Sequence, residues 1–75
     1  MAQRRQGASS TALKALKTLE IVADTANELS VQQLAEKLGT DKTTAYRMLI
    51  TLEEAGYVSR DEYGKRYSLT YKVVS

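Results

Sequence analysis

The chain has 75 residues with a formal net charge of +2, and it contains no cysteine and no histidine. This length fits a single domain with one small core, without space for a separate ligand pocket. The missing cysteines exclude a disulfide framework or a thiolate metal site, and the missing histidines remove the usual general base near neutral pH. No apolar run is long enough to span a bilayer, and a signal-peptide hydrophobic region is lacking. These features predict a cytoplasmic protein that is not an enzyme, does not enter a membrane and holds no metal or cofactor.

The N-terminal part of the chain is predicted to be a flexible arm followed by a helix. Residues 1–9 have no apolar period, which is typical of a mobile segment. Ser10 or Thr11 is expected to cap the helix. The inward stripe of the helix is predicted to be Ala12, Leu16, Leu19 and Ala23, with Leu13 and Val22 on its flanks. Because Leu13 and Ile21 fall off the centre of this stripe, the helix is expected to be buried on two sides, the second of them against another subunit.

Residues 30–56 have the pattern of two helices joined by a tight turn. Ser30 and Gln33 match a capping box at the start of the first helix, and Gly39 supplies a left-handed residue at its end. Thr40 or Asp41 is expected to cap the second helix. Apolar residues recur at helical spacing, first as Val31, Leu34, Ala35 and Leu38 and then as Ala45, Met48, Leu49 and Leu52. This is the layout of a helix-turn-helix, whose second helix enters the DNA major groove.

The second helix is predicted to run from about Asp41 to Ala55, and its outward face carries the candidate DNA contacts. At about 100° per residue, this face lies opposite the core stripe. Arginine can bond bidentately to guanine, threonine can donate to bases, and donors in the first helical turn can bind a phosphate. The predicted contacts are Lys42, Thr43, Thr44, Tyr46 and Arg47. The alternative is that these are ordinary solvated positions.

After the second helix, the chain is predicted to form a β-hairpin with a basic tip. The strands are expected at residues 57–60 and 66–69, around a turn that contains Gly64. Lys65 and Arg66 are predicted to contact the DNA backbone or the minor groove. The acidic residues expected to weaken this attraction are Asp61 and Glu62, and the inward residues of the hairpin are expected to be Val58, Tyr67 and Leu69. The alternative is a charged edge hairpin that only prevents aggregation.

These segments resemble the N-terminal domain of the IclR family of bacterial transcriptional regulators. The matching segments are ALKALKTLEIVA, LSVQQLAEKLGTDKTTAYRMLITLEEAGYV and GKRYSL, which cover nearly everything from Ala12 to Leu69. The resemblance implies a mainly α (α+β) winged helix-turn-helix over residues 10–69, with three helices and a two-stranded wing. It also implies operator binding as a homodimer, with tetramers in the full-length protein. Residues 70–75 are expected to start a linker helix to an absent effector domain, so no ligand is expected in this fragment.

The leading hypothesis is therefore sequence-specific binding of double-stranded DNA by a bacterial transcriptional regulator. The first alternative is a winged helix that binds protein and has lost DNA binding. Such a module would lack a convergent basic surface, which here is expected from Lys42, Arg47, Lys65 and Arg66. An enzyme or nucleotide-binding module is disfavoured because the sequence has no phosphate-cradling glycine loop, metal-ligand cluster or acid–base pair. RNA binding fits the charge but lacks an aromatic platform.

Overall fold

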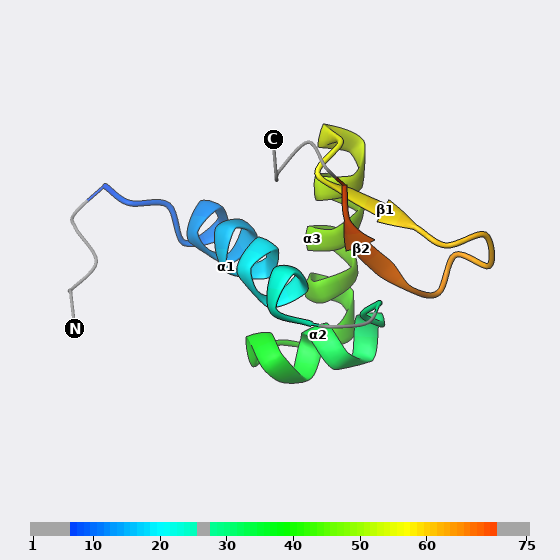
Figure 1. Ribbon diagram of the computed structural model, residues 1–75. Helices are drawn as coiled ribbons and strands as arrows, with labels where there is room; N and C mark the ends of the chain where they lie inside the picture. The colour runs from blue at the N-terminus through cyan, green and yellow to red at the C-terminus, as the bar shows by residue number, and fades with distance from the viewer. Residues whose placement is uncertain (1–6, 26–27, 71–75) are drawn as a thin grey trace.

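The structure, a computed structural model, describes residues 7–25 and 28–70. Over these residues the chain forms three helices followed by a two-stranded antiparallel hairpin (Figure 1). The helices are α1 (Ser10–Asp24), α2 (Val31–Leu38) and α3 (Lys42–Ala55), and the strands are β1 (Val58–Arg60) and β2 (Tyr67–Leu69). The tip of the hairpin projects away from α3 on the side opposite α1. The predicted mainly α (α+β) winged helix-turn-helix is thus confirmed.

The start of α1 differs slightly from the prediction. Ser9 is the N-cap, and its hydroxyl oxygen accepts a hydrogen bond from the amide of Ala12 at 3.1 Å. The expected cap at Ser10 or Thr11 was wrong, because three consecutive hydroxyl residues offer equivalent caps and only their backbone geometry distinguishes them. Of the arm predicted at residues 1–9, the first six residues lie outside the described part of the chain.

The buried face of α1 also differs from the predicted one. Thr18 and Val22 are buried, and half-buried Leu19 packs against the same core. Thr18 is buried without an unsatisfied group because its hydroxyl donates to the carbonyl oxygen of Lys14 at 2.8 Å. The predicted inward residues that the structure leaves exposed are Ala12, Leu16 and Ala23. The prediction was wrong here because apolar residues surround most of this helix, so the period alone does not select the buried side.

The capping signals of the helix-turn-helix are confirmed. The amide of Ser30 donates to Gln33 Oε1 at 2.9 Å, and the amide of Gln33 donates to Ser30 Oγ at 3.1 Å, which completes the capping box. Gly39 and Gly56 end α2 and α3 in the left-handed conformation, with φ of 75° and 90°. Asp41, rather than Thr40, is the N-cap of α3. Of these residues, Gly39 and Asp41 lie in the turn that joins α2 to α3.

The core lies between the three helices and the inner side of the hairpin. The predicted stripes of α2 and α3 are confirmed. Their buried members are Leu34, Ala35, Ala45, Leu49 and Leu52, and their half-buried members are Val31, Leu38 and Met48. Over residues 7–25 and 28–70, none of the helices has the length and apolar content needed to cross a membrane.

A third segment joins the hairpin at its inner edge. Leu29 and Tyr67 exchange two backbone hydrogen bonds, each 2.8 Å long, and both side chains are buried. β1 and β2 pair in a register that runs from Val58–Leu69 to Arg60–Tyr67, and each strand starts one residue later than predicted. The Leu29 bridge was not predicted, because a single paired residue creates no period in the sequence. The bridge holds β2 between β1 and the segment that enters α2.

Thr70 closes the base of the hairpin. Its amide donates to the carbonyl oxygen of Tyr57 at 3.0 Å, and its hydroxyl donates to that of Gly56 at 2.7 Å. The end of β2 is therefore attached to the residue that terminates α3. Beyond Thr70, the linker helix predicted to start within residues 70–75 lies outside the described residues.

Candidate nucleic-acid interface

The N-terminal half of α3 presents most of the predicted DNA contacts to solvent. Lys42, Thr43 and Arg47 are exposed, Tyr46 is 43% exposed, and Thr44 is half-buried. The opposite side of the helix is packed in the core, so the orientation of the exposed face is fixed by burial rather than by contacts of its own. This is the condition a recognition helix needs, because base contacts depend on a defined side-chain geometry.

The cap of α3 alters how its first turn can bind an anion. Asp41 Oδ1 accepts hydrogen bonds from the Thr44 amide and the Thr40 hydroxyl, both at 3.3 Å. Hydrogen bonds from Thr44 and Thr40 hold the pKa of Asp41 below its ordinary value of 3.8. The carboxylate is therefore ionised at neutral pH. It already accepts the hydrogen bond of the Thr44 amide, one of the first-turn donors that were predicted to bind a phosphate. Lys42 and Thr43 are exposed in this turn.

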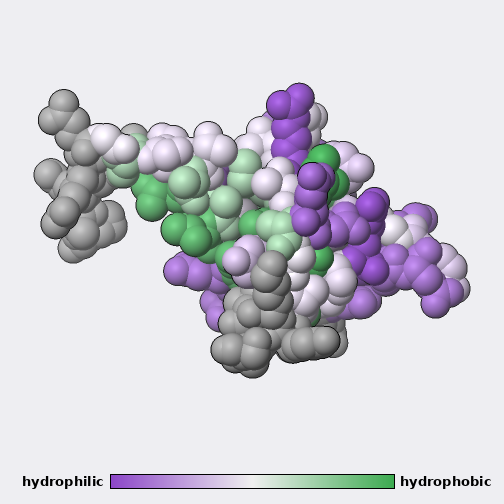
Figure 2. All heavy atoms as spheres, turned by 90° about the horizontal axis from the view of Figure 1, so that it is seen from above, coloured by the Kyte–Doolittle hydropathy of each residue, from purple (hydrophilic) through white to green (hydrophobic). Residues whose placement is uncertain are grey.

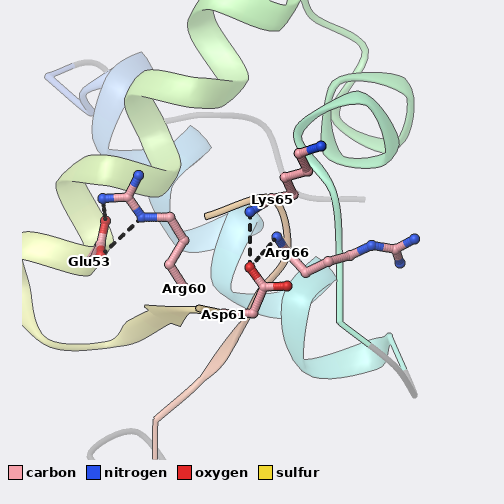
Figure 3. Close-up of polar contacts among 5 residues, drawn as sticks. All are labelled: Glu53, Arg60, Asp61, Lys65 and Arg66. Atoms are coloured by element: carbon pink, nitrogen blue, oxygen red, sulfur yellow. Dashed lines mark hydrogen bonds and ion pairs between the residues drawn. The ribbon is translucent and has the colours of Figure 1, made fainter. Parts of the chain in front are cut away.

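The turn of the wing is organised by one carboxylate. Asp61 Oδ1 accepts hydrogen bonds from the amides of Lys65 at 2.9 Å and Arg66 at 3.3 Å (Figure 3). The amide of Gly64, which has a φ of 70°, donates to the carbonyl oxygen of Asp61 at 2.9 Å. These backbone hydrogen bonds, that from Lys65 first, lower the pKa of Asp61 below its ordinary value of 3.8. Asp61, which was expected to weaken the attraction of DNA, thus uses its carboxylate to bond the backbone of the wing turn.

The two cations of the wing point in different directions. Figure 3 shows the side chains of Lys65 and Arg66 diverging from adjacent positions. The Arg66 guanidinium donates from Nη1 to the carbonyl oxygen of Glu28 at 3.2 Å, which ties it to the segment between α1 and α2. Lys65 is exposed on the wing turn. The two residues predicted to form one basic tip therefore differ in their surroundings. Lys65 is exposed at the turn, whereas Arg66 also bonds the segment between α1 and α2.

A further arginine, which was not among the predicted site residues, connects the wing to α3. Arg60 Nη2 lies 3.1 Å from Glu53 Oε1, and Arg60 Nε donates to Glu53 Oε2 at 3.3 Å (Figure 3). The guanidinium carbon of Arg60 is also 5.9 Å from the centre of the Tyr67 ring. The two partners are separated by the end of α3 and a turn, so no helical or strand period places them together. Only the tertiary arrangement reveals the pair.

Tyr46 links the predicted contacts of α3 to this junction. The hydrogen bond to Glu53 raises the pKa of Arg60 most, and the nearby phenol of Tyr46 adds to the effect. Burial raises the pKa of Tyr67, and Tyr46 raises it further. Tyr46 therefore lies within electrostatic range of both wing residues.

Comparison with known proteins identifies the domain type. Residues 11–62 match the IclR helix-turn-helix domain. The chain is 31% identical over 64 residues to the HTH-type transcriptional regulator KdgR of Dickeya chrysanthemi, an alignment that covers 85% of this chain and 21% of that protein. The KdgR of Escherichia coli (strain K12) matches at 31% identity, with 85% of this chain and 24% of that protein covered. The chain therefore spans about a quarter or less of the length of these curated relatives.

Solved structures agree with this assignment. The IclR of Thermotoga maritima is similar with a TM-score of 0.76 and 34% identity, over 85% of this chain and 26% of that chain. An IclR transcriptional regulator from Alicyclobacillus acidocaldarius is similar with a TM-score of 0.79 and 31% identity, over 89% of this chain and 27% of that chain. The chain belongs to the IclR family, and it is a winged-helix DNA-binding domain of that family.

Proposed function

We propose that this domain recognises a specific operator in double-stranded DNA, with α3 in the major groove and the wing on the neighbouring backbone. The observation that carries the proposal is an α3 whose polar face is exposed while its opposite face is fixed in the core. Arg47 reads a base, with Thr43 beside it, because arginine and threonine both have groups that match base edges. The remaining predicted residues of α3 position the helix against phosphates and the wing. They are Lys42 and Thr44 in the first turn, and Tyr46.

In this proposal the wing supplies backbone contacts. Lys65 neutralises a phosphate, since its ammonium is a flexible point charge with no fixed geometry for reading a base. Arg66 also faces the backbone, although its bond to the Glu28 carbonyl limits its reach. A protein-binding winged helix without DNA contact is less consistent with this arrangement, because the exposed face in the N-terminal half of α3 is polar and carries two cations, Lys42 and Arg47.

The direct test is a selection of bound sequences from random duplex DNA with the isolated domain. We expect a recurrent half-site, with affinity that falls as salt rises because phosphate neutralisation releases counterions. The selected duplex should bind more tightly than a scrambled duplex of the same composition at every salt concentration. Equal affinity for the two duplexes would contradict sequence-specific recognition.

We further propose that the domain binds its operator as a homodimer through α1, in the bacterial cytoplasm. Leu13 and Leu16 are 45% and 59% exposed, and they lie among the exposed alanines of the same helix. Figure 2 shows hydrophobic residues gathered over α1, in contrast to the hydrophilic wing side. Pairing of two such faces about a two-fold axis would place the recognition helices in half-sites roughly 34 Å apart or a multiple of that spacing. Tetramers of the longer protein would combine two such dimers.

A further inference from the structure

The pair between Glu53 and Arg60 joins the two parts of the proposed DNA surface. Glu53 lies near the end of α3 and Arg60 is the last residue of β1. Their two contacts, of 3.1 and 3.3 Å, use two nitrogens and two oxygens, which is the bidentate geometry that carboxylate–arginine pairs favour. The side chains are 37% and 30% exposed for Arg60 and Glu53, so the pair lies at the surface without being fully solvated.

The Arg60 side chain also packs against the other strand of the wing. Its guanidinium stands over the ring of Tyr67, its partner across the hairpin. A Cβ added to Gly64 would be 3.6 Å from Arg60 Cδ, so the arginine stem lies beside the turn of the wing. Arg60 therefore contacts both β2 and α3.

The wing needs such support to hold a fixed direction. Its ladder has only three residue pairs, and a short isolated hairpin is marginally stable in water. At its base the wing is attached through Gly56, Tyr57 and Thr70. At the other end of the ladder, the Leu29 bridge and the Arg66 bond to the Glu28 carbonyl hold β2. The contact with Glu53 ties β1 to α3 at that same end. Since Tyr46 and Glu53 are seven residues apart and share a face of α3, the contact holds the wing beside the face that carries Tyr46.

We propose that the Glu53–Arg60 pair is a positioning clamp that sets the angle between the wing and α3 so that both engage one DNA duplex. The inference rests on the DNA-binding function proposed above. Arg60 is a positioning residue here, because its Nε and Nη2 atoms bond Glu53 rather than a phosphate. The competing hypothesis is that Glu53 acts only as a negative charge, which weakens the attraction between this surface and DNA.

These two roles predict effects of opposite sign for Glu53→Gln. Removing a negative charge beside a phosphate-binding surface strengthens binding if charge alone matters. Loss of the clamp weakens binding, by about two- to fivefold given the modest strength of exposed ion pairs. It also lowers the slope of log affinity against log salt by up to about 0.9, because one wing phosphate contact is lost. A general loss of stability would not change that slope.

The matched control is Glu54→Gln, which makes the same charge change one residue away. Glu54 is exposed, and no ion pair among residues 7–25 and 28–70 involves it. This variant should bind DNA as well as the wild-type domain or slightly more tightly. Arg60→Lys keeps the charge but removes the bidentate geometry, so it should reproduce the loss seen in Glu53→Gln. The double variant should be no weaker than either single variant, since all three remove the same interaction.

The measurement is fluorescence anisotropy on the selected half-site over a salt series, with a thermal melt of each variant. Weaker binding and a lower slope for Glu53→Gln and Arg60→Lys, but not for Glu54→Gln, would support the clamp. Tighter binding for Glu53→Gln and Glu54→Gln alike would overturn it and leave Glu53 as a repulsive charge. Failure of the wild-type domain to prefer the selected duplex would instead overturn the proposed function. The two failures are therefore distinguishable.

Discussion

Replacement of Leu16 by glutamine tests the proposed pairing through α1. Fully burying a leucine side chain is worth about 1.5–3 kcal/mol, so covering the exposed 59% of Leu16 is worth about 1–2 kcal/mol. A two-fold interface contains two copies of this side chain. We therefore expect Leu16→Gln to remove about 2–3.5 kcal/mol of coupling between two half-sites, which corresponds to about a 30- to 300-fold loss of cooperative binding. Glutamine is neutral and helix-compatible, so neither the DNA electrostatics nor the helix should change.

The assay compares one half-site with a paired site, using analytical ultracentrifugation for stoichiometry and anisotropy for affinity. Half-site binding should stay within about twofold of wild type, because an exposed substitution changes stability by about 0.5 kcal/mol or less. Ile21 is a poorer target than the sequence suggested, since it is half-buried and packs against the core. A one-to-one complex on the paired site with the wild-type domain, or unchanged cooperativity in Leu16→Gln, would refute pairing through this face.

Three further predictions concern the DNA-facing residues and the wing. Arg47→Ala should cost about 1–3 kcal/mol on the selected duplex and relax discrimination at one base position; equal losses on selected and scrambled duplexes, measured at fixed salt, would make Arg47 a phosphate contact. Lys65→Ala and Arg66→Ala should each lower the salt slope by roughly 1 on any sequence, and Arg66→Ala alone should also lower the melting temperature because its bond to the Glu28 carbonyl is lost; an unchanged slope in both would show that the wing does not touch DNA. Because the pKa of Asp61 is depressed, its stabilisation of the wing turn is complete above its unfolded pKa and is lost as pH falls through the lower folded pKa. In an NMR titration the Lys65 and Arg66 amide signals should therefore move with a midpoint below 3.8, a transition that Asp61→Asn should abolish, and a midpoint at or above that value would contradict the hydrogen-bonded turn.

The sequence by itself determined the helix-turn-helix and its outward face. The capping box of Ser30 and Gln33 and the left-handed Gly39 and Gly56 act within a few residues of their own position. So does the cap of α3, for which the sequence allowed Thr40 or Asp41 and the structure has Asp41. Such contacts depend only on residues a few positions apart, so the local sequence pattern predicts them directly. The stripes of α2 and α3 were equally clear, since each helix has one apolar side, and the exposed positions of Lys42, Thr43 and Arg47 follow from them.

Only the tertiary structure decided which side of α1 enters the core and how the wing is held. The apolar residues of α1 surround most of the helix, so the choice between Leu16 and Thr18 depended on the shape of α2, α3 and β2 around it. The Leu29 bridge to β2 and the Glu53–Arg60 pair join residues from different elements with no shared period. Whether such groups meet depends on the summed angles of every intervening turn, and a local sequence pattern does not contain that information.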